Sequence, residues 1–174
     1  MDKDQCPEII FLIGPPGSGK STWLEQYFAM LARTRAPEHI PTYAIISTDR
    51  MVEQRMAEHG IDYTAAFAMV PKEESDQMCF NKLYGCLKNN YHIIVDQTNV
   101  DKATRAAKLA LVPENYFKRA IVFNLPREVV MQRVNAPERL AAGKVIPDFV
   151  MQKMFDTYEE PDLSEFHEIE FVTQ

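Results

Sequence analysis

Short hydrophobic runs alternate along the chain with longer segments in which apolar residues recur at helical spacing. The runs that are short and apolar enough to be strands cover residues 8–13, 43–47, 92–96, 120–125 and 168–172. The first of them, EIIFLI, shows no alternation of polar and apolar positions, which is typical of a strand buried on both faces of a parallel sheet. The last run is predicted to be an edge strand.

Helical periodicity occupies most of the segments between these runs. Helices are predicted from Lys20 to about residue 33, over 50–59, 76–90, 102–111 and 128–134, and from Pro147 onward. Strands that alternate with helices favour right-handed crossovers and a parallel sheet. We therefore predict an α/β fold, a mainly parallel five-stranded sheet flanked by helices. The segment 60–75 is the least predictable part of the chain.

The composition is that of one globular domain spanning residues 1–174. Hydrophobic residues make up 46% of the chain and charged residues 25%, a balance found in folded chains. The three cysteines, Cys6, Cys79 and Cys86, predict neither a disulfide framework nor a zinc site and favour a reducing compartment. No run is long enough for a membrane span or a signal-peptide core. We expect a cytoplasmic protein, or a nuclear one if the source is eukaryotic, with no membrane partner.

The formal net charge of −6 is distributed unevenly. Residues 147–174 carry eight acidic side chains and one lysine, a net charge of −7, which leaves +1 for residues 1–146. A net negative charge disfavours extensive, sequence-independent wrapping of nucleic acid. The acidity of this C-terminal segment does not exclude a polyanionic substrate at a site within the first 146 residues.

A glycine-rich segment follows the first predicted strand and matches the phosphate-binding pattern G-x-x-x-x-G-K-[ST]. It comprises Gly14, Pro15, Pro16, Gly17, Ser18, Gly19, Lys20 and Ser21, with Thr22 next in the chain. Glycines let backbone N–H groups curl around phosphate oxygens, and the following helix adds its positive dipole end. The strand before it and the amphipathic helix after it are the context that the pattern requires. This predicts a nucleoside triphosphate site, with Lys20 on the β- and γ-phosphates and the Ser21 hydroxyl on Mg²⁺.

Two aspartates come directly after predicted strands, at the sheet edge where parallel α/β proteins bind ligands. Asp96 ends the apolar run IIVD and is the candidate second ligand of the metal. Asp49 follows the second strand and is the candidate acceptor of a hydroxyl proton during attack on the γ-phosphate. The alternative role for Asp49 is to cap the helix predicted to begin at Arg50, and the two roles are compatible.

Residues 135–146 contain proline, glycine and basic residues, and they predict a mobile loop. Arg133 and Arg139 lie just before and within this loop. Phosphoryl transfer requires positive charge over the transferring group, which arginines on a closing lid often supply. We interpret residues 135–146 as such a lid; the alternative is a solvated loop without a function.

With these elements the chain resembles the P-loop polynucleotide 5′-kinase family, in particular the kinase domains of phage-type and eukaryotic end-healing enzymes. The matching segments are residues 14–23, the Asp49 element, the sequence Asp96-Gln97-Thr98-Asn99, and the stretch from Arg133 to Pro147. The resemblance implies transfer of the γ-phosphate of ATP, with Mg²⁺, to a nucleic-acid hydroxyl, most simply the 5′-OH end of DNA or RNA.

The resemblance also implies roles for particular residues. Asp49 is then the general base, and Arg139, followed by Arg133, best matches the lid arginine. Thr98 and Arg105 are candidates for contacts with the substrate. Family members often carry an arginine three residues after the base, a position that Val52 occupies here, so the acceptor need not be an ordinary 5′ end.

Two alternatives follow from the same residues. One is a P-loop kinase that acts on another hydroxyl, such as that of a hydroxymethylated base in DNA or of a small metabolite. The other is a catalytically silent, ATP-dependent RNA-binding module, because the chain is also similar to the kinase-like domain of the heterogeneous nuclear ribonucleoprotein U family. That group shares the Asp-Gln-Thr-Asn-Val element but can lack the base aspartate. The presence of Asp49 favours an active enzyme.

Overall fold

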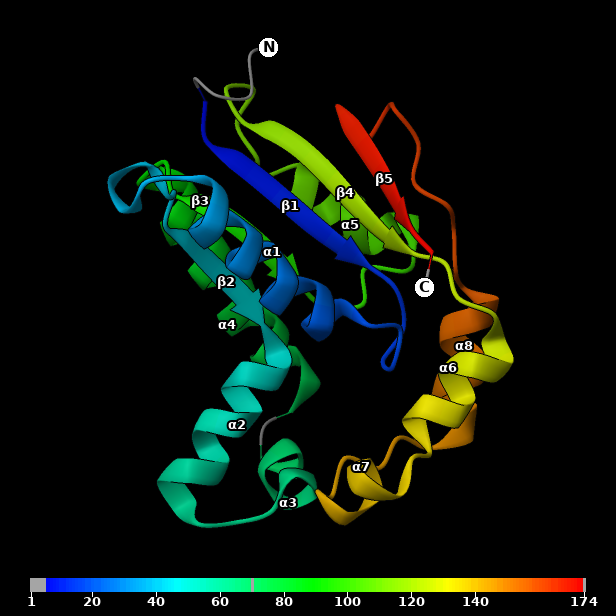
Figure 1. Ribbon diagram of the computed structural model, residues 1–174. Coiled ribbons are helices and arrows are strands. Elements are labelled where there is room, and N and C mark those ends of the chain that lie inside the picture. The colour runs from blue at the N-terminus through cyan, green and yellow to red at the C-terminus, as the bar shows by residue number, and fades with distance from the viewer. Residues whose placement is uncertain (1–5, 70, 174) are drawn as a thin grey trace.

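The computed structural model describes residues 6–69 and 71–173, which form a parallel sheet with helices on both faces (Figure 1). The strands are β1 (Glu8–Ile13), β2 (Tyr43–Ser47), β3 (His92–Asp96), β4 (Phe117–Phe123) and β5 (Glu168–Val172). Their spatial order is β2-β3-β1-β4-β5, and every neighbouring pair is parallel. The predicted α/β fold with a five-stranded parallel sheet is confirmed, and β5 lies at an edge as predicted.

The helices of the described residues follow the predicted order, with three additions. They are α1 (Lys20–Thr34), the short 3₁₀ helix η1 (Pro37–His39), α2 (Thr48–His59), α3 (Tyr63–Ala68), α4 (Lys72–Lys88), α5 (Lys102–Leu109), α6 (Arg127–Val134), α7 (Pro137–Ala141) and α8 (Asp148–Asp156). The three additions are η1, α3 and α7. Helix α3 lies in the segment for which the sequence predicted least. It begins after Asp62, whose carboxylate accepts the Ala65 N–H at 2.8 Å as an N-cap.

Strand β4 begins three residues earlier than its hydrophobic run predicts. Lys118 and Arg119 interrupt the apolar pattern, yet both lie within the ladder that pairs β4 with β1. The polar side chain of Arg119 is accommodated because its guanidinium forms ion pairs with Glu168 and Glu170 on the neighbouring strand β5. The start of β4 could not be predicted from hydrophobicity, because Arg119 is charged and its ion-pair partners lie on β5, which is distant in the sequence.

The two faces of the sheet are covered by different helices. On one face, Leu24 of α1 packs with Ile10 and Leu12 of β1. On the opposite face, Cys79 and Leu83 of α4 pack with the alternate residues of the same strand, together with Val112 and Phe166. All six residues of β1 are buried, as its unalternating sequence predicts.

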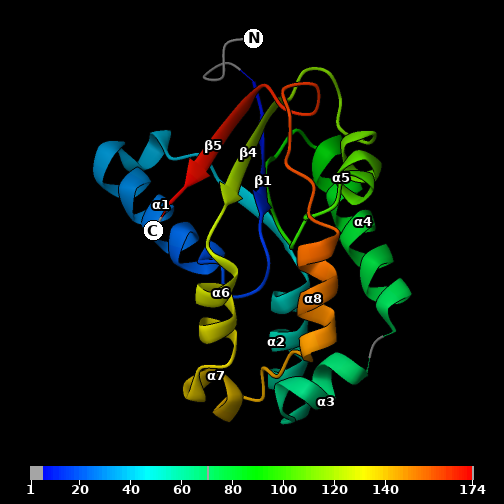
Figure 2. The same cartoon turned by 90° about the vertical axis from the view of Figure 1, so that its right-hand side faces the viewer.

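The strands all point toward one end of the molecule, where the remaining helices gather. Figures 1 and 2 show α2, α3, α7, α6 and α8 beyond the carboxyl ends of the strands. Residues 135–146, predicted as a loop, contain the helix α7, so the prediction of a lid without regular structure is wrong. Pro137 supplies the first turn of α7, a position where its missing N–H costs nothing. Throughout residues 6–69 and 71–173, no helix has the length and hydropathy to cross a membrane.

Half of the acidic residues of the C-terminal segment are paired with cations of the fold. The exposed Asp162 forms an ion pair with Lys102 at 2.8 Å, and Arg119 pairs with two glutamates of β5. Glu165 forms a buried ion pair with Arg105 at 2.8 Å. These pairs attach the C-terminal segment to α5 and β4.

Candidate active site

The glycine-rich loop connects β1 to α1 at the centre of the sheet, between β3 and β4. Gly17 and Gly19 have φ angles of 79° and 99°, a region that side-chain-bearing residues rarely occupy. A Cβ atom at Gly17 would also lie 2.8 Å from Cγ2 of Val134 on α6, so this glycine is required by packing as well. The first N–H groups of α1 lack partners within the helix and are available to an anion.

Lys20 lies within the loop and contacts its backbone. Its ammonium donates hydrogen bonds to the carbonyl oxygens of Gly14 and Pro15, at 2.8 and 2.9 Å. Removal from water lowers the pKa of Lys20 to about 8; the carboxylates of Asp96 and Asp49 oppose this shift. The ammonium is therefore held beside the place where the loop would receive phosphate oxygens.

A cavity of about 400 Å³ brings most of the predicted site residues together. It is lined by residues of the loop and α1, by the two strand-end aspartates and by two arginines: Pro16, Gly17, Gly19, Lys20, Ser21, Thr22, Asp49, Asp96, Arg133 and Arg139. We call it the P-loop cavity. Its walls come from the glycine-rich loop and from α1, β3, α2, α6 and α7, segments that are distant in the sequence. The other residues of the loop do not line the cavity and are buried: Gly14, Pro15 and Ser18.

Asp49 lies in the first turn of α2 with its side chain exposed. The alternative that it caps this helix is wrong, because the Ser47 hydroxyl is the N-cap and accepts the Arg50 N–H at 3.5 Å. Instead, Asp49 Oδ1 accepts a hydrogen bond from the hydroxyl of Tyr63 on α3 at 2.7 Å. Burial and the adjacent carboxylate raise the pKa of Tyr63, so the phenol retains its proton and acts as the donor.

Asp96 ends β3 and lies in register with Ser47 of β2 and Leu12 of β1. Burial raises the pKa of Asp96, while the nearby Lys20 ammonium and a hydrogen bond with Ser47 oppose the rise. Asp96 and the exposed Ser21 line the same cavity, and one carboxylate plus one hydroxyl is a donor set that suits Mg²⁺, which keeps waters and takes phosphate oxygens as its other ligands. The described residues contain no cluster of three or more His, Cys, Asp or Glu side chains that could hold a metal without such ligands.

The residues after Asp96 attach the glycine-rich loop to the sheet. The Thr98 carbonyl accepts the Gly14 N–H at 2.9 Å. The amide of Asn99, which is buried and has a φ of 48°, donates to the Leu12 carbonyl at 2.9 Å. Its oxygen accepts a 2.6 Å hydrogen bond from the buried ammonium of Lys108 on α5. The Asp-Gln-Thr-Asn sequence thus fixes the start of the loop through Thr98 and Asn99.

Two arginines approach the cavity from the lid side. Arg133 lies on α6 and Arg139 on α7, and both are partly buried. The Nε atom of Arg139 is buried without a hydrogen-bond partner in the described part of the chain. A buried guanidinium nitrogen without an acceptor is suited to a ligand that brings one.

The lid contacts α2 and α3 on the far side of the cavity. The Thr64 hydroxyl donates to the Gly143 carbonyl at 2.8 Å, and Lys144 forms an ion pair with Glu53 of α2, also at 2.8 Å. The Lys144 ammonium also lies 5.3 Å from the centroid of the Tyr63 ring. The arginine-bearing segment is therefore closed against the helix that carries Asp49.

The prediction that Arg105 contacts the substrate is wrong, and so is the alternative that it lies on a solvated helix face. Its side chain is 0% exposed. The guanidinium binds both carboxylate oxygens of Glu165, at 2.8 and 2.9 Å, and donates to the carbonyls of Asn99, Val100 and Glu159. With these donors occupied, Arg105 joins α5 to the C-terminal segment instead of binding a ligand.

Two functional contacts were missed by sequence reasoning. Tyr63 belongs to a six-residue helix, too short to show periodicity, and only the capping residue Asp62 signals it. The pair of Asn99 and Lys108 was missed because a lysine on an amphipathic helix is ordinarily expected to face solvent.

The fold and the loop define the class of the protein as a P-loop protein with a kinase-type fold. The family model AAA_33, described as an AAA domain, matches residues 9–161, and the chain belongs to this family. The predicted resemblance to polynucleotide kinases and to the ribonucleoprotein U group agrees with the relatives found.

Among solved structures, the chain is similar to one in the structure of the Pnkp1/Rnl/Hen1 RNA repair complex, with a TM-score of 0.63 and 24% identity. That match covers 87% of this chain and 44% of the other. A gluconokinase from Sinorhizobium meliloti has a TM-score of 0.56 and 16% identity, with coverage of 97% and 84%. These likenesses establish the shared fold.

Among curated proteins, heterogeneous nuclear ribonucleoprotein U-like protein 2 of Mus musculus is 24% identical over 169 residues, and the Homo sapiens protein has the same identity over the same length. The match covers 94% of this chain but 21% of those proteins. The chain therefore spans about a fifth of the length of these relatives.

Proposed function

We propose that the protein is an ATP-dependent phosphotransferase that acts on a nucleic-acid hydroxyl, most simply the 5′-OH end of DNA or RNA. The observation that carries this proposal is the P-loop cavity, where a phosphate-binding loop, two aspartates and two arginines face the same space. A nucleotide switch requires the loop but has no need for an exposed carboxylate opposite it. A phosphotransferase requires both.

The donor nucleotide is held by the loop in this proposal. The backbone N–H groups of Gly17 and of residues 19–22, together with the Lys20 ammonium, contact the phosphates. Ser21 and Asp96 would hold Mg²⁺, which neutralises charge on the β- and γ-phosphate oxygens when bound. The Lys20 hydrogen bonds to Gly14 and Pro15 must be exchanged for bonds to phosphate when the nucleotide enters.

The acceptor hydroxyl is activated by Asp49. Its exposed carboxylate accepts the hydroxyl proton while the hydroxyl oxygen forms a bond to the γ-phosphorus and the bond to the β-γ bridging oxygen breaks, releasing ADP. Tyr63 holds Oδ1 of Asp49, so Oδ2 is the atom directed to the acceptor. Arg139, with Arg133, supplies positive charge to the oxygens of the transferring group.

A polynucleotide acceptor is supported by two observations. The chain is similar to a component of an RNA repair complex and to a ribonucleoprotein U-like protein. Four of the eight acidic residues of the C-terminal segment, Asp162, Glu165, Glu168 and Glu170, pair with cations, and no acidic residue of that segment lines the P-loop cavity. We also propose that Thr98 contacts the acceptor, and that the enzyme acts inside the cell, where ATP is available.

The proposal is tested by incubating the protein with γ-labelled ATP and a panel of acceptors. The panel contains 5′-OH DNA, 5′-OH RNA, DNA with a hydroxymethylated base, gluconate and shikimate. Label on a 5′-OH end supports the proposal. Label on a small acid identifies a P-loop kinase for another class of hydroxyl, and ATP binding without label on any acceptor identifies a silent module; either result overturns the proposal. Label on the modified base alone keeps a nucleic-acid acceptor and overturns the assignment of the 5′-OH end.

A further inference from the structure

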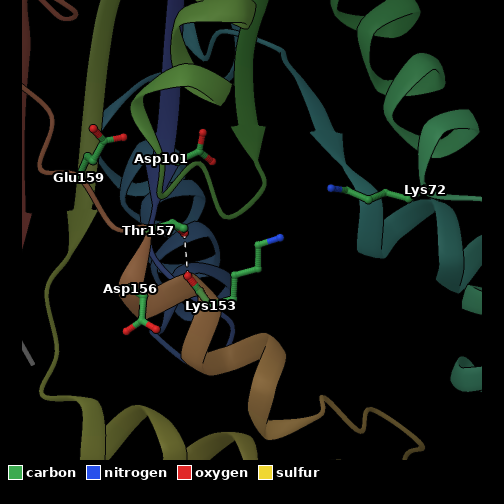
Figure 3. A pocket seen from close by; sticks show the side chains of 6 residues that line it. All are labelled: Lys72, Asp101, Lys153, Asp156, Thr157 and Glu159. Carbon is green, nitrogen blue, oxygen red and sulfur yellow. Dashed lines mark hydrogen bonds between the residues drawn. The ribbon is translucent and has the colours of Figure 1, made fainter.

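A second cavity, of about 550 Å³, lies beside the P-loop cavity on the side of α4 and α5. It is lined by Lys72, Asp101, Lys153, Asp156, Thr157 and Glu159 (Figure 3). The loop after β3 connects the two, because Asp96 lines the first cavity and Asp101 the second. These aspartates are five residues apart, and an extended chain spans at most about 3.6 Å per residue, so their Cα atoms lie within about 18 Å.

The two lysines are the groups that this cavity offers to a ligand. Figure 3 shows Lys72, from the start of α4, and Lys153, from α8, reaching into the gap from opposite sides. Neither has an ion-pair partner within residues 6–69 and 71–173. Two ammonium groups that converge without a carboxylate between them favour an anion.

The carboxylates at the rim are occupied by other groups. Asp101 caps α5 by accepting the Thr104 N–H at 2.7 Å, and Glu159 accepts the Lys102 N–H at 2.8 Å. Asp156 accepts a hydrogen bond from the Gln152 amide within α8. In Figure 3 the side chains of Asp156 and Glu159 point away from the gap between the lysines. Each carboxylate keeps its charge but has a structural role, and the two lysines are the charged lining side chains without an ion pair or hydrogen bond in the described part of the chain.

Side chains of α3 extend the site beyond the proposed base. Tyr63 touches Asp49, and the Phe67 ring stacks on Tyr63 with centroids 6.2 Å apart and an interplanar angle of 18°. Phe67 is 55% exposed and lies five residues before Lys72 in the chain. An exposed aromatic ring is a surface on which a base of a single-stranded nucleic acid can stack.

The position expected to bind the acceptor phosphate cannot do so in this chain. Val52 is apolar and 6% exposed within α2, and Arg105 is fully buried against Glu165. Lys144, which lies near the same helices, is paired with Glu53. None of these three side chains is therefore free to bind a phosphate of the acceptor strand.

We propose that Lys72 and Lys153 together bind a backbone phosphate of a single-stranded acceptor, whose 5′-OH end lies at Asp49 and whose chain passes Phe67. The inference rests on the proposed function, since it assigns the acceptor strand of that same site. It makes affinity dependent on strand length, because an acceptor that ends after one nucleotide stops short of the second cavity.

The test compares the wild type with the double variant Lys72→Gln/Lys153→Gln. The KM for a 5′-OH single-stranded oligonucleotide is expected to rise about tenfold, whereas a nucleoside 3′-monophosphate gains little from these lysines. The ratio of the KM for the oligonucleotide to the KM for the mononucleotide therefore rises about tenfold. Lys88→Gln, which removes one positive charge at the far end of α4, is the control and keeps the wild-type ratio. An unchanged ratio in the double variant overturns the inference.

A binding measurement separates this inference from the proposed function. The affinity of a labelled oligonucleotide is measured without ATP at several salt concentrations, so that catalysis plays no part. Loss of one phosphate contact reduces the slope of log affinity against log salt by about 0.7 for a single strand. A further outcome is that the wild type transfers no label while the double variant still shows the reduced slope of log affinity against log salt. In that case the acceptor site is supported and the catalytic proposal fails. Equal slopes in both proteins overturn the inference whatever the activity.

Discussion

The hydroxyl of Tyr63 donates a 2.7 Å hydrogen bond to Oδ1 of Asp49, the carboxylate proposed to accept the proton of the attacking hydroxyl. The same ring lies under the ammonium of Lys144 in the lid. One aromatic side chain thus contacts both the proposed base and the predicted lid, residues 135–146. This contact couples the orientation of Asp49 to the docked position of the lid.

Replacing Tyr63 by Phe removes the hydrogen bond and keeps the ring. We expect kcat to fall about tenfold with little change in the KM for ATP, because a hydrogen bond to a charged group contributes about 1.5–3 kcal/mol and each 1.36 kcal/mol changes a rate tenfold. Tyr63→Ala removes the ring as well and is expected to weaken lid docking, which raises the KM for ATP. Steady-state kinetics that show Tyr63→Phe and Tyr63→Ala to be identical would contradict a separate role for the hydroxyl.

Replacing Arg139 by Ala is expected to lower kcat by about 10³-fold, the lower end of the contribution of an arginine that stabilises the transferring phosphoryl group. Its Nε atom has no acceptor in the described structure, so little stability depends on it. Arg127→Ala on the neighbouring helix α6 removes the same charge outside the P-loop cavity and is the control. Single-turnover rates measure the effect; equal losses in both variants would exclude a specific role for Arg139.

The affinity for ATP should depend on the ionisation of Lys20. Because burial lowers its pKa to about 8, the ammonium is present below this pH and is lost as the pH rises through it. We expect the affinity to fall roughly tenfold between pH 8.5 and 9.5, as proton linkage requires. Lys20→Met should bind weakly with no such dependence. Calorimetric titration across this range measures it, and a flat profile for the wild type is incompatible with this account.

Replacing Arg105 by Ala should destabilise the protein by about 3–5 kcal/mol, since it leaves the nearly buried Glu165 carboxylate without its partner. Urea denaturation measures this loss. The exposed pair of Lys102 and Asp162 joins the same two segments, and Lys102→Ala is expected to change stability little. A loss for Arg105→Ala no larger than that of the control would mean that the buried pair adds no stability.

The fold and the centre of the site could be predicted from the sequence because their signals are local. Each strand is a short apolar run, and the residues that follow β1, β2 and β3 in the chain necessarily meet at one sheet edge. For this reason Lys20, Asp49 and Asp96 were placed together without knowledge of the helices. Their grouping in one cavity follows from the order of strands.

The contacts that could not be predicted join residues distant in the chain. Arg105 and Glu165 are 60 residues apart, and a charged helix residue gives no local sign that it is buried against a distant glutamate. Tyr63 reaches Asp49 only because α3 folds back against α2. Helix α7 is a single short segment opened by Pro137, and the glycine and proline content of residues 135–146 indicated a loop instead.

The measurement that tests the central claim most directly is the rate of γ-phosphate transfer to a 5′-OH oligonucleotide by Asp49→Asn, at saturating ATP. The substitution keeps the size and the hydrogen bond from Tyr63 but removes the proton acceptor. The account predicts a rate about 10²–10⁴-fold below the wild type, the usual contribution of a general base, with ATP binding nearly unchanged. A rate within about threefold of the wild type would show that Asp49 is not the base.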